Sequence, residues 1–124
     1  MQPIAENLFS DETPPRLLGG RDAHGRLVFP YPPGAVPVPL ARRGTIWSHT
    51  VQRFRPKSPP YAGPPSFEPF IVAYVELPGE TIICARLTGI APDSVRIGMA
   101  VELAPAALDT ADGPRAIPAF RPVP

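Results

Sequence analysis

The most constraining feature of this 124-residue sequence is where its 21 prolines do not occur. No proline lies in residues 40–55, 70–77 or 79–91, although proline is abundant on either side of these windows. Proline cannot donate to a β-ladder and is kept out of central strands. Because 44% of the residues are also hydrophobic, the pattern indicates a folded β domain with stiff connections and not a disordered proline-rich chain.

The proline-free windows contain three predicted strands. β-branched and aromatic residues dominate residues 44–54, 70–77 and 81–87, as is typical of pleated surfaces. Between the last two runs, Pro78 presets the backbone for a turn and Gly79 tolerates a positive φ. These two runs therefore predict a hairpin.

Two further strands are predicted towards the C-terminus. Residues 99–103 alternate in polarity, and residues 115–123 hold a short apolar run around prolines, which indicates an edge strand. We expect a loop over residues 104–113 and one turn of α- or 3₁₀-helix within residues 92–98. Five strands in this order predict a mostly β protein, a small and partly open barrel of the oligonucleotide/oligosaccharide-binding (OB) type.

The connection between the first two strands, residues 55–69, is far longer than most hairpin loops. It is rich in proline and carries Tyr61 and Phe67, and Phe70 follows it. The segment could pack over the open end of the barrel. We favour docking on a partner subunit, because prolines lower the entropy cost of presenting aromatic side chains and aromatic residues are enriched in interfaces.

The first 40 residues differ in character from the rest. Residues 4–9 predict a short amphipathic helix, because their apolar side chains share one side. Residues 31–39 have proline at nearly every second position, which favours extended polyproline-type backbone. We therefore expect an N-terminal arm over residues 1–40 and a barrel domain over residues 41–124.

Charge and cysteine content narrow the possible functions. Twelve basic and eleven acidic residues give a net charge of +1, which provides little general attraction for nucleic acid or anionic lipid. The single cysteine, Cys84, lies in an apolar strand, so we expect a buried thiol in a reducing compartment. No stretch resembles a secretory signal or a membrane-spanning helix. The sequence thus predicts a soluble, cytoplasmic protein.

No group of residues predicts catalysis. A nucleophilic Cys84 would need a base, and no motif places His24 or His49 beside it. We expect His24 to be an exposed turn residue and, by alternation, His49 to share the strand face of Trp47. Trp47 fits the barrel core or rim, or a contact with a partner.

Several motifs, in this order and at this spacing, resemble the DUF35 family. They cover most of the chain from residue 17 onward and comprise Gly44-Thr-Ile-Trp47-Ser48-His-Thr50-Val, the proline loop 59–70, Tyr74-Val-Glu-Leu-Pro-Gly79, Arg86-Leu-Thr-Gly89, Val95-Arg-Ile97-Gly98-Met99-Ala-Val101-Glu-Leu and Phe120-Arg-Pro122. Members of this family are OB-fold proteins with an N-terminal rubredoxin-like zinc ribbon. The resemblance therefore implies an OB barrel preceded by a ribbon-like arm.

One part of the family pattern is missing. The ribbon typically carries two Cys-x-x-Cys pairs, which fall here on Arg21 and His24 and near Ala35 and Val38. A structural zinc site needs about four Cys or His ligands. We therefore expect a degenerate ribbon without metal or any other cofactor, in which the proline-rich strap restrains the arm.

The resemblance also implies a function. Family members are non-catalytic companions of acyl-CoA enzymes, including thiolases, thiolase-like acyltransferases and aldolases, and in some cases hydratases. An accessory subunit of this kind would stabilise a thiolase-like or hydratase-like partner and shape its acyl-CoA channel. Partner contacts are then expected from the aromatic candidates Trp47, Tyr61, Phe67 and Phe70.

A basic cluster supports the main alternative. It comprises Arg42 and Arg43, which precede the first predicted strand, and Arg53, Arg55 and Lys57, which lie at the end of that strand and at the start of the long connection. OB grooves that bind single-stranded nucleic acid combine positive charge with stacking aromatic residues, but here the aromatics interleave poorly with the charges. The same charges could instead be solvated or contact the phosphates of coenzyme A, for which Arg53, Arg55 and Lys57 are the candidates.

Overall fold

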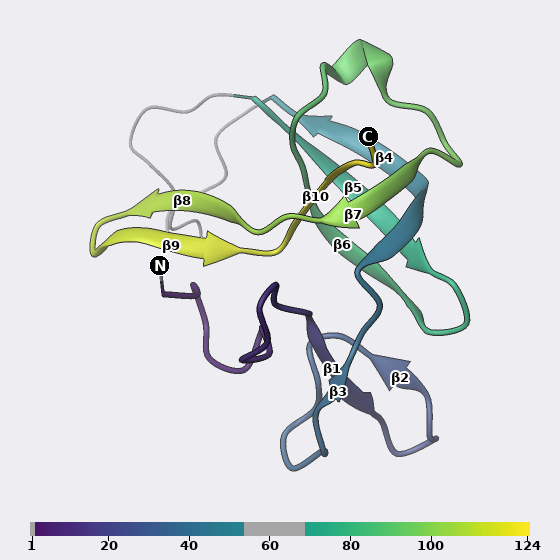
Figure 1. Ribbon diagram of the computed structural model, residues 1–124, viewed down its shortest axis with the longest axis vertical. Coiled ribbons are helices and arrows are strands. Elements are labelled where there is room, and N and C mark those ends of the chain that lie inside the picture. The colour runs from purple at the N-terminus through teal and green to yellow at the C-terminus, as the bar shows by residue number, and fades with distance from the viewer. Residues whose placement is uncertain (1, 54–68) are drawn as a thin grey trace.

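The computed structural model describes residues 2–53 and 69–124, and five of its strands close a barrel (Figure 1). The barrel order is β10-β6-β5-β4-β7. Its strands are β4 (Arg43–Gln52), β5 (Phe70–Leu77), β6 (Thr81–Leu87), β7 (Ala100–Leu103) and β10 (Ala119–Pro122). β10 runs parallel to β6, and the other barrel pairs are antiparallel. The predicted five-stranded OB architecture is confirmed.

The hairpin of β5 and β6 follows directly from the sequence pattern. Its strands coincide with the predicted runs, and Gly79 adopts a φ of 72° in the turn. The amide of Glu80 closes this turn by donating to the carbonyl oxygen of Leu77 at 2.9 Å. Alternation then buries Ile83 and Ala85 of β6 against Phe120, which is fully buried.

Gly44 allows β4 to approach β5 closely at the point where β4 also pairs with β7. A Cβ atom at Gly44 would overlap the carbonyl oxygen of Glu76 and lie 2.9 Å from Cγ1 of Val75. Real Cβ atoms do not come this close to a neighbouring backbone. Glycine is therefore required for the strand crossing that shapes this side of the barrel.

The C-terminal third corrects two predictions. β8 (Ala106–Thr110) and β9 (Gly113–Ile117) form a separate two-stranded sheet, so residues 104–113 are not a simple loop. Residues 115–123 are not one edge strand, because Pro118 separates β9 from β10 and β10 closes the barrel between β6 and β7. Alanine and aspartate in β8 are poor strand formers. The local strand propensity of residues 106–110 therefore does not predict β8 or its pairing with β9.

The predicted N-terminal helix over residues 4–9 does not form. Instead, the amide of Ile4 donates to the carbonyl oxygen of Ala116 at 2.8 Å, and Asn7 has a φ of 63°, which is incompatible with an α-helix. So short a helix is marginal, and pairing with β9 satisfies its backbone instead. In the described parts of the chain the only helical element is the 3₁₀ turn η1 (Pro92–Ser94), as predicted. No helix there is long and apolar enough to cross a membrane.

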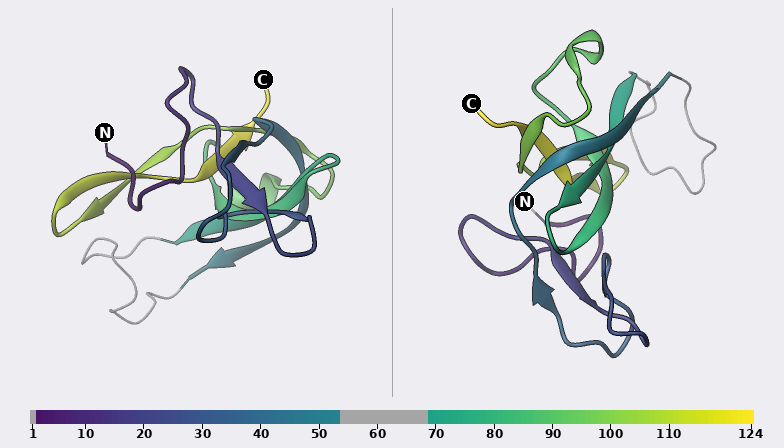
Figure 2. Two further views of the ribbon diagram at one scale, coloured as in Figure 1. Left: turned by 90° about the horizontal axis from the view of Figure 1, so that it is seen from below. Right: turned by 90° about the vertical axis from the view of Figure 1, so that its right-hand side faces the viewer.

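The N-terminal arm contains a small sheet with the order β2-β1-β3 (Figure 2). Its strands are β1 (Leu18–Arg21), β2 (Leu27–Val28) and β3 (Val38–Pro39). The arm lies at the barrel end where β5 turns into β6, since the amide of Ala41 donates to Oε1 of Glu80 at 2.8 Å. Leu17 and Leu40 are fully buried in the same core cluster as the barrel strands. The division into residues 1–40 and 41–124 stays a prediction.

Candidate functional site

A β-bulge in β4 places Trp47 on the outer surface of the barrel. The register shifts between Ile46, which faces Val75, and Ser48, which faces Tyr74, so Trp47 has no ladder partner in β5. Trp47 is 56% exposed, which excludes the core position that the sequence left open. Its ring meets that of Tyr74 edge-on, with the ring centroids 6.4 Å apart.

The same bulge turns His49 towards the barrel interior. His49 pairs with Ala73, which is fully buried, and the Nδ1 atom of His49 is buried without a hydrogen bond to any described residue. The prediction that His49 shares the face of Trp47 is wrong. An inserted residue shifts the phase of the alternation, and the sequence does not reveal the insertion.

Cys84 is exposed, so the prediction of a buried thiol is also wrong. β6 alternates as expected, but its inward positions are Ile83 and Ala85, and Cys84 lies between them on the outside. Composition suggests burial for cysteine in an apolar strand. The phase of this strand is decided by the barrel, which needs the neighbours of Cys84 in its core.

These side chains form one continuous surface, here called the outer face and defined by Trp47, Tyr74, Ile82 and Cys84. Tyr74 lies opposite Cys84 in the β5–β6 ladder. Tyr74 and Ile82 are 43% and 41% exposed. Single exposed apolar residues are ordinary, but contiguous ones mark interaction sites. From the sequence, only Trp47 of this set is predicted as a contact residue, although the hairpin register identifies the others as outward-facing.

Phe70 and Arg53 lie together at the other end of the barrel from the arm. Phe70 faces Gln52 in the ladder, and Arg53 follows as an exposed residue. The guanidinium of Arg86 lies over the Phe70 ring, 3.7 Å from its centroid, in a cation–π contact. We call Arg53, Phe70 and Arg86 the loop end. The structure thus brings two predicted residues together and adds Arg86, which the sequence analysis missed.

The remaining predicted site residues fall outside the described residues. These are Tyr61 and Phe67 among the aromatic candidates and Arg55 and Lys57 among the basic ones. Their predicted roles therefore stay predictions.

Two other members of the basic cluster are engaged within the fold. Arg42 donates from Nε to the carbonyl oxygen of Pro15 at 3.2 Å and from NH2 to that of Leu103 at 3.0 Å. Arg43 lies 3.6 Å from Oε1 of Glu102. Arg42 therefore connects elements of the fold, whereas the side chain of Arg43 is 71% exposed and its charge remains open to solvent.

The positions of the family's zinc ligands do not fit a metal. Oδ1 of Asp22 accepts hydrogen bonds from the backbone amides of His24 at 2.8 Å and Arg26 at 3.0 Å, which makes an exposed turn. His24 is exposed there, as predicted. Arg21, Ala35 and Val38 occupy the other positions and offer no ligand for zinc. Among the described residues, no group of three or more His, Cys, Asp or Glu side chains could hold a metal ion.

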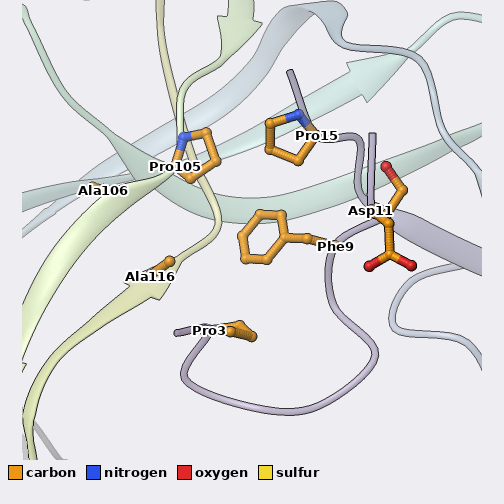
Figure 3. A pocket seen from close by; sticks show the side chains of 8 residues that line it. Pro3, Phe9, Asp11, Pro15, Pro105, Ala106 and Ala116 are labelled. Atoms are coloured by element: carbon orange, nitrogen blue, oxygen red, sulfur yellow. The ribbon is translucent and has the colours of Figure 1, made fainter. Parts of the chain in front are cut away.

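A pocket of about 500 Å³ lies between the N-terminal segment and the β8–β9 hairpin (Figure 3). Phe9 extends into it, prolines line much of its wall, and Asp11 is the only charged residue among the described residues that line it. The other polar residue, Ser10, uses its Oγ to accept a hydrogen bond from the amide of Arg16 at 3.0 Å. Among the described residues that line the pocket, there is no paired acid and base and none of the predicted site residues.

Comparison with known proteins agrees with the OB-type barrel described above. Residues 37–104 match the family model described as ChsH2, C-terminal OB-fold domain. The chain is 40% identical over 88 residues to a probable enoyl-CoA hydratase alpha subunit of Thermomonospora curvata, covering 68% of this chain and 24% of that protein. It is 29% identical over 97 residues to a DUF35 domain-containing scaffold protein of Pyrococcus furiosus, covering 71% of this chain and 67% of that protein. This chain thus spans about a quarter of the length of the first relative.

A solved structure extends the likeness beyond the barrel. The Ltp2-ChsH2(DUF35) aldolase matches with a TM-score of 0.64 and 33% sequence identity, covering 86% of this chain and 84% of the matched chain. Coverage of this extent includes residues outside the OB-fold match. The protein described here therefore belongs to the DUF35 family, with an OB-fold domain of the ChsH2 C-terminal type.

Proposed function

We propose that this chain is a non-catalytic accessory subunit of an acyl-CoA-processing enzyme complex, with a thiolase-like or hydratase-like enzyme as its partner. The names of its relatives support this proposal: a scaffold protein, a probable enoyl-CoA hydratase subunit and the ChsH2 component of an aldolase. In this role the chain stabilises the enzyme subunit and forms part of the wall of its acyl-CoA channel. The nucleophile and base belong to the partner.

The observation that carries the proposal is the separation of the reactive side chains. Cys84 points outward from β6, whereas His49 points into the barrel from β4. A nucleophile and its base must lie within hydrogen-bond reach. The sheet stands between this thiol and this imidazole, and His24 lies in the turn of the arm.

The loop end is the proposed contact with the enzyme. Phe70 and Arg86 present a stacked aromatic and cationic pair, and aromatic residues and arginine are enriched at interfaces. Tyr61 and Phe67 are proposed to join them, and Trp47 is proposed as a subunit contact as well. Arg53, Arg55 and Lys57 are proposed to meet the phosphates of coenzyme A.

Co-expression with a thiolase-like or hydratase-like enzyme of the same organism, followed by size-exclusion chromatography, tests the proposal. We expect co-elution in a fixed ratio and a more stable or more active enzyme. The substitution R53E should weaken co-elution, because it reverses a charge at the loop end. The matched control is R96E on the loop after η1, where Arg96 is exposed. Separate elution together with unchanged enzyme activity would contradict the proposal.

One observation favours the alternative, binding of single-stranded nucleic acid. Trp47 and Tyr74 are exposed on the barrel surface that OB folds use for oligonucleotides. Against it, Arg42 is engaged within the fold and Glu76 is exposed beside the aromatics. Titration with a single-stranded oligonucleotide at two salt concentrations decides the matter, because phosphate contacts weaken steeply with salt. The accessory role predicts no such binding.

A further inference from the structure

We propose that the outer face of Trp47, Tyr74, Ile82 and Cys84 binds a second copy of this chain, forming a two-fold symmetric dimer. This inference goes beyond the accessory function and does not depend on it. Trp47 alone is 56% exposed, and Tyr74 and Ile82 each expose about two fifths of their surface. A contiguous apolar surface of this kind is typical of an interface.

The register of the strands places charges symmetrically about this surface. Cys84 and Tyr74 form the middle row of the β5–β6 ladder. Two residues away in one direction lies the pair of Glu76 and Ile82, and two residues away in the other lies the pair of Val72 and Arg86. These positions all point outward, because the intervening residues are buried in the core. The negatively charged Glu76 and the positively charged Arg86 therefore lie on opposite sides of the row formed by Tyr74 and Cys84.

Neither of these charges is paired with an opposite charge among the described residues. Glu76 is exposed, and neither Glu76 nor Arg86 forms an ion pair with another described residue. The guanidinium of Arg86 lies over the ring of Phe70. The two rows are four residues apart, a distance of about 13 Å along the strands. The surface thus carries a negative end and a positive end.

Such a surface is complementary to itself in one orientation. A two-fold axis in the plane of the interface, perpendicular to the strands and level with Cys84, reverses the strand direction of the second copy. Glu76 then lies beside Arg86 of the second copy, and the reverse pair forms by symmetry. An axis parallel to the strands would place Glu76 against Glu76. The charges therefore select the antiparallel arrangement.

The size of the surface determines the expected strength. Three strands spaced about 4.8 Å apart give a narrow face, smaller than the roughly 800 Å² per partner of a standard stable interface. We expect a dimer that dissociates on dilution. The antiparallel arrangement directs the two loop ends away from each other, so Arg53 and Phe70 of each copy remain accessible to its own enzyme subunit, whereas Arg86 is turned to the second copy.

Reversal of the two charges tests the proposal on the purified chain. Sedimentation velocity from about 1 μM to about 1 mM should show a monomer–dimer equilibrium for the native sequence. E76R or R86E alone should weaken the dimer at least about tenfold, because like charges then face each other. The double variant E76R/R86E should restore it, since the exchanged charges again pair across the axis. D109R, at an exposed position on β8, is the matched control and should leave the dimer unchanged.

Trp47 and Cys84 are the only tryptophan and the only cysteine in the chain, so each reports on this face alone. Facing sheets lie about 10 Å apart, beyond the Cα separation that a disulfide allows. A short bis-maleimide should therefore link Cys84 to Cys84 in the native protein and fail to do so in E76R. The emission of Trp47 should shift to shorter wavelength as the dimer forms. A monomer throughout the concentration range, or a double variant as weak as the single ones, would overturn the proposal.

The two proposals fail in different ways. A monomeric chain that still co-elutes with the acyl-CoA enzyme overturns the dimer and leaves the accessory function intact. A chain that forms the dimer but does not bind the enzyme overturns the accessory function and leaves the dimer intact. Protection of Cys84 by the enzyme, with a native chain that is monomeric at every concentration, would assign the outer face to the enzyme and overturn self-association.

Discussion

Single residues in β4 decide what the barrel presents to its surroundings. Gly44 allows the close crossing over Glu76, and the extra residue at Trp47 shifts the phase of everything that follows it. Trp47 is exposed as a result, and His49 becomes an interior residue. A change of one position in register therefore exchanges the side chains that the molecule shows and hides.

The substitution G44A tests the close approach. A methyl group at this position overlaps the carbonyl oxygen of Glu76, and the backbone there cannot move aside without breaking the ladder. We expect a loss of about 2 kcal/mol in the free energy of unfolding, as for overpacked cores. Urea denaturation measures it. T50V, at an exposed position of the same strand, should change stability by less than about 0.5 kcal/mol, and an equally small effect of G44A would contradict the argument.

The thiol of Cys84 provides a second test at this scale. Because Cys84 is exposed on β6, a thiol reagent should label the native protein in dilute solution nearly as fast as the denatured protein. Ellman's reagent follows the reaction, and C84S is the blank. If labelling begins only when denaturant unfolds the chain, Cys84 is buried, as the sequence predicts, and its exposure on β6 is contradicted.

Among the elements, arginine side chains make contacts within the arm, between the arm and the barrel, and within the barrel. Arg16 donates from Nε to the carbonyl oxygen of Leu40 at 2.7 Å, and Arg42 connects Pro15 with Leu103 of β7. On the far side of β7, Glu102 accepts from Nε of Arg121 at 3.1 Å. These contacts cross between segments that are distant in the sequence. They show why the basic residues near position 42 have a structural role.

R42A should weaken the attachment of the arm. Removal of the guanidinium leaves the carbonyl oxygens of Pro15 and Leu103 without this donor, and hydrogen bonds to charged groups contribute about 1.5–3 kcal/mol. We expect a loss of about 2 kcal/mol in stability, together with faster amide exchange in β1 and β3. Hydrogen exchange by mass spectrometry measures the second effect.

R26A is the matched control for this experiment. Arg26 lies in the exposed turn after Asp22, so its side chain can be removed with little change in exchange or stability. Equal behaviour of the two variants would show that Arg42 does not hold the arm.

At the scale of the whole molecule, the β8–β9 hairpin is an insertion into a complete barrel. β7 and β10 already pair through Leu103 and Phe120, and the amide of Ala104 donates to the carbonyl oxygen of Ala119 at 2.8 Å. The two strands that flank the insertion are therefore adjacent without it. The hairpin mainly covers the N-terminal segment and one wall of the pocket.

Replacement of residues 105–118 by Asn-Gly should leave a folded barrel. Asn-Gly favours the tight turn that connects antiparallel strands such as β7 and β10. We expect cooperative unfolding to persist at lower stability, because the buried Leu108 and Ile117 are lost. Circular dichroism and urea denaturation test this expectation. Loss of the cooperative transition would show that the hairpin is part of the barrel's folding unit.

How far the sequence predicts this fold varies from element to element. β5 and β6 were predicted residue for residue, because a long apolar run with a Pro-Gly turn carries its information locally. The 3₁₀ turn η1 was predicted for the same reason. β8 and β9 were not, since alanine-rich strands reveal themselves only by pairing. At the site, alternation and aromatic content singled out Trp47 and Phe70, but not Tyr74, Arg86 or the exposure of Cys84.

The sequence by itself determined the fold class, because proline is absent wherever a ladder must form and apolar residues recur at strand period between the turns. It also determined the family, whose motifs span those strands. Only the tertiary structure decided which side chains meet. The bulge at Trp47, the phase of β6 around Cys84 and the stacking of Arg86 on Phe70 each depend on pairing between strands. Pairing is a property of two segments at once, and no single segment encodes it.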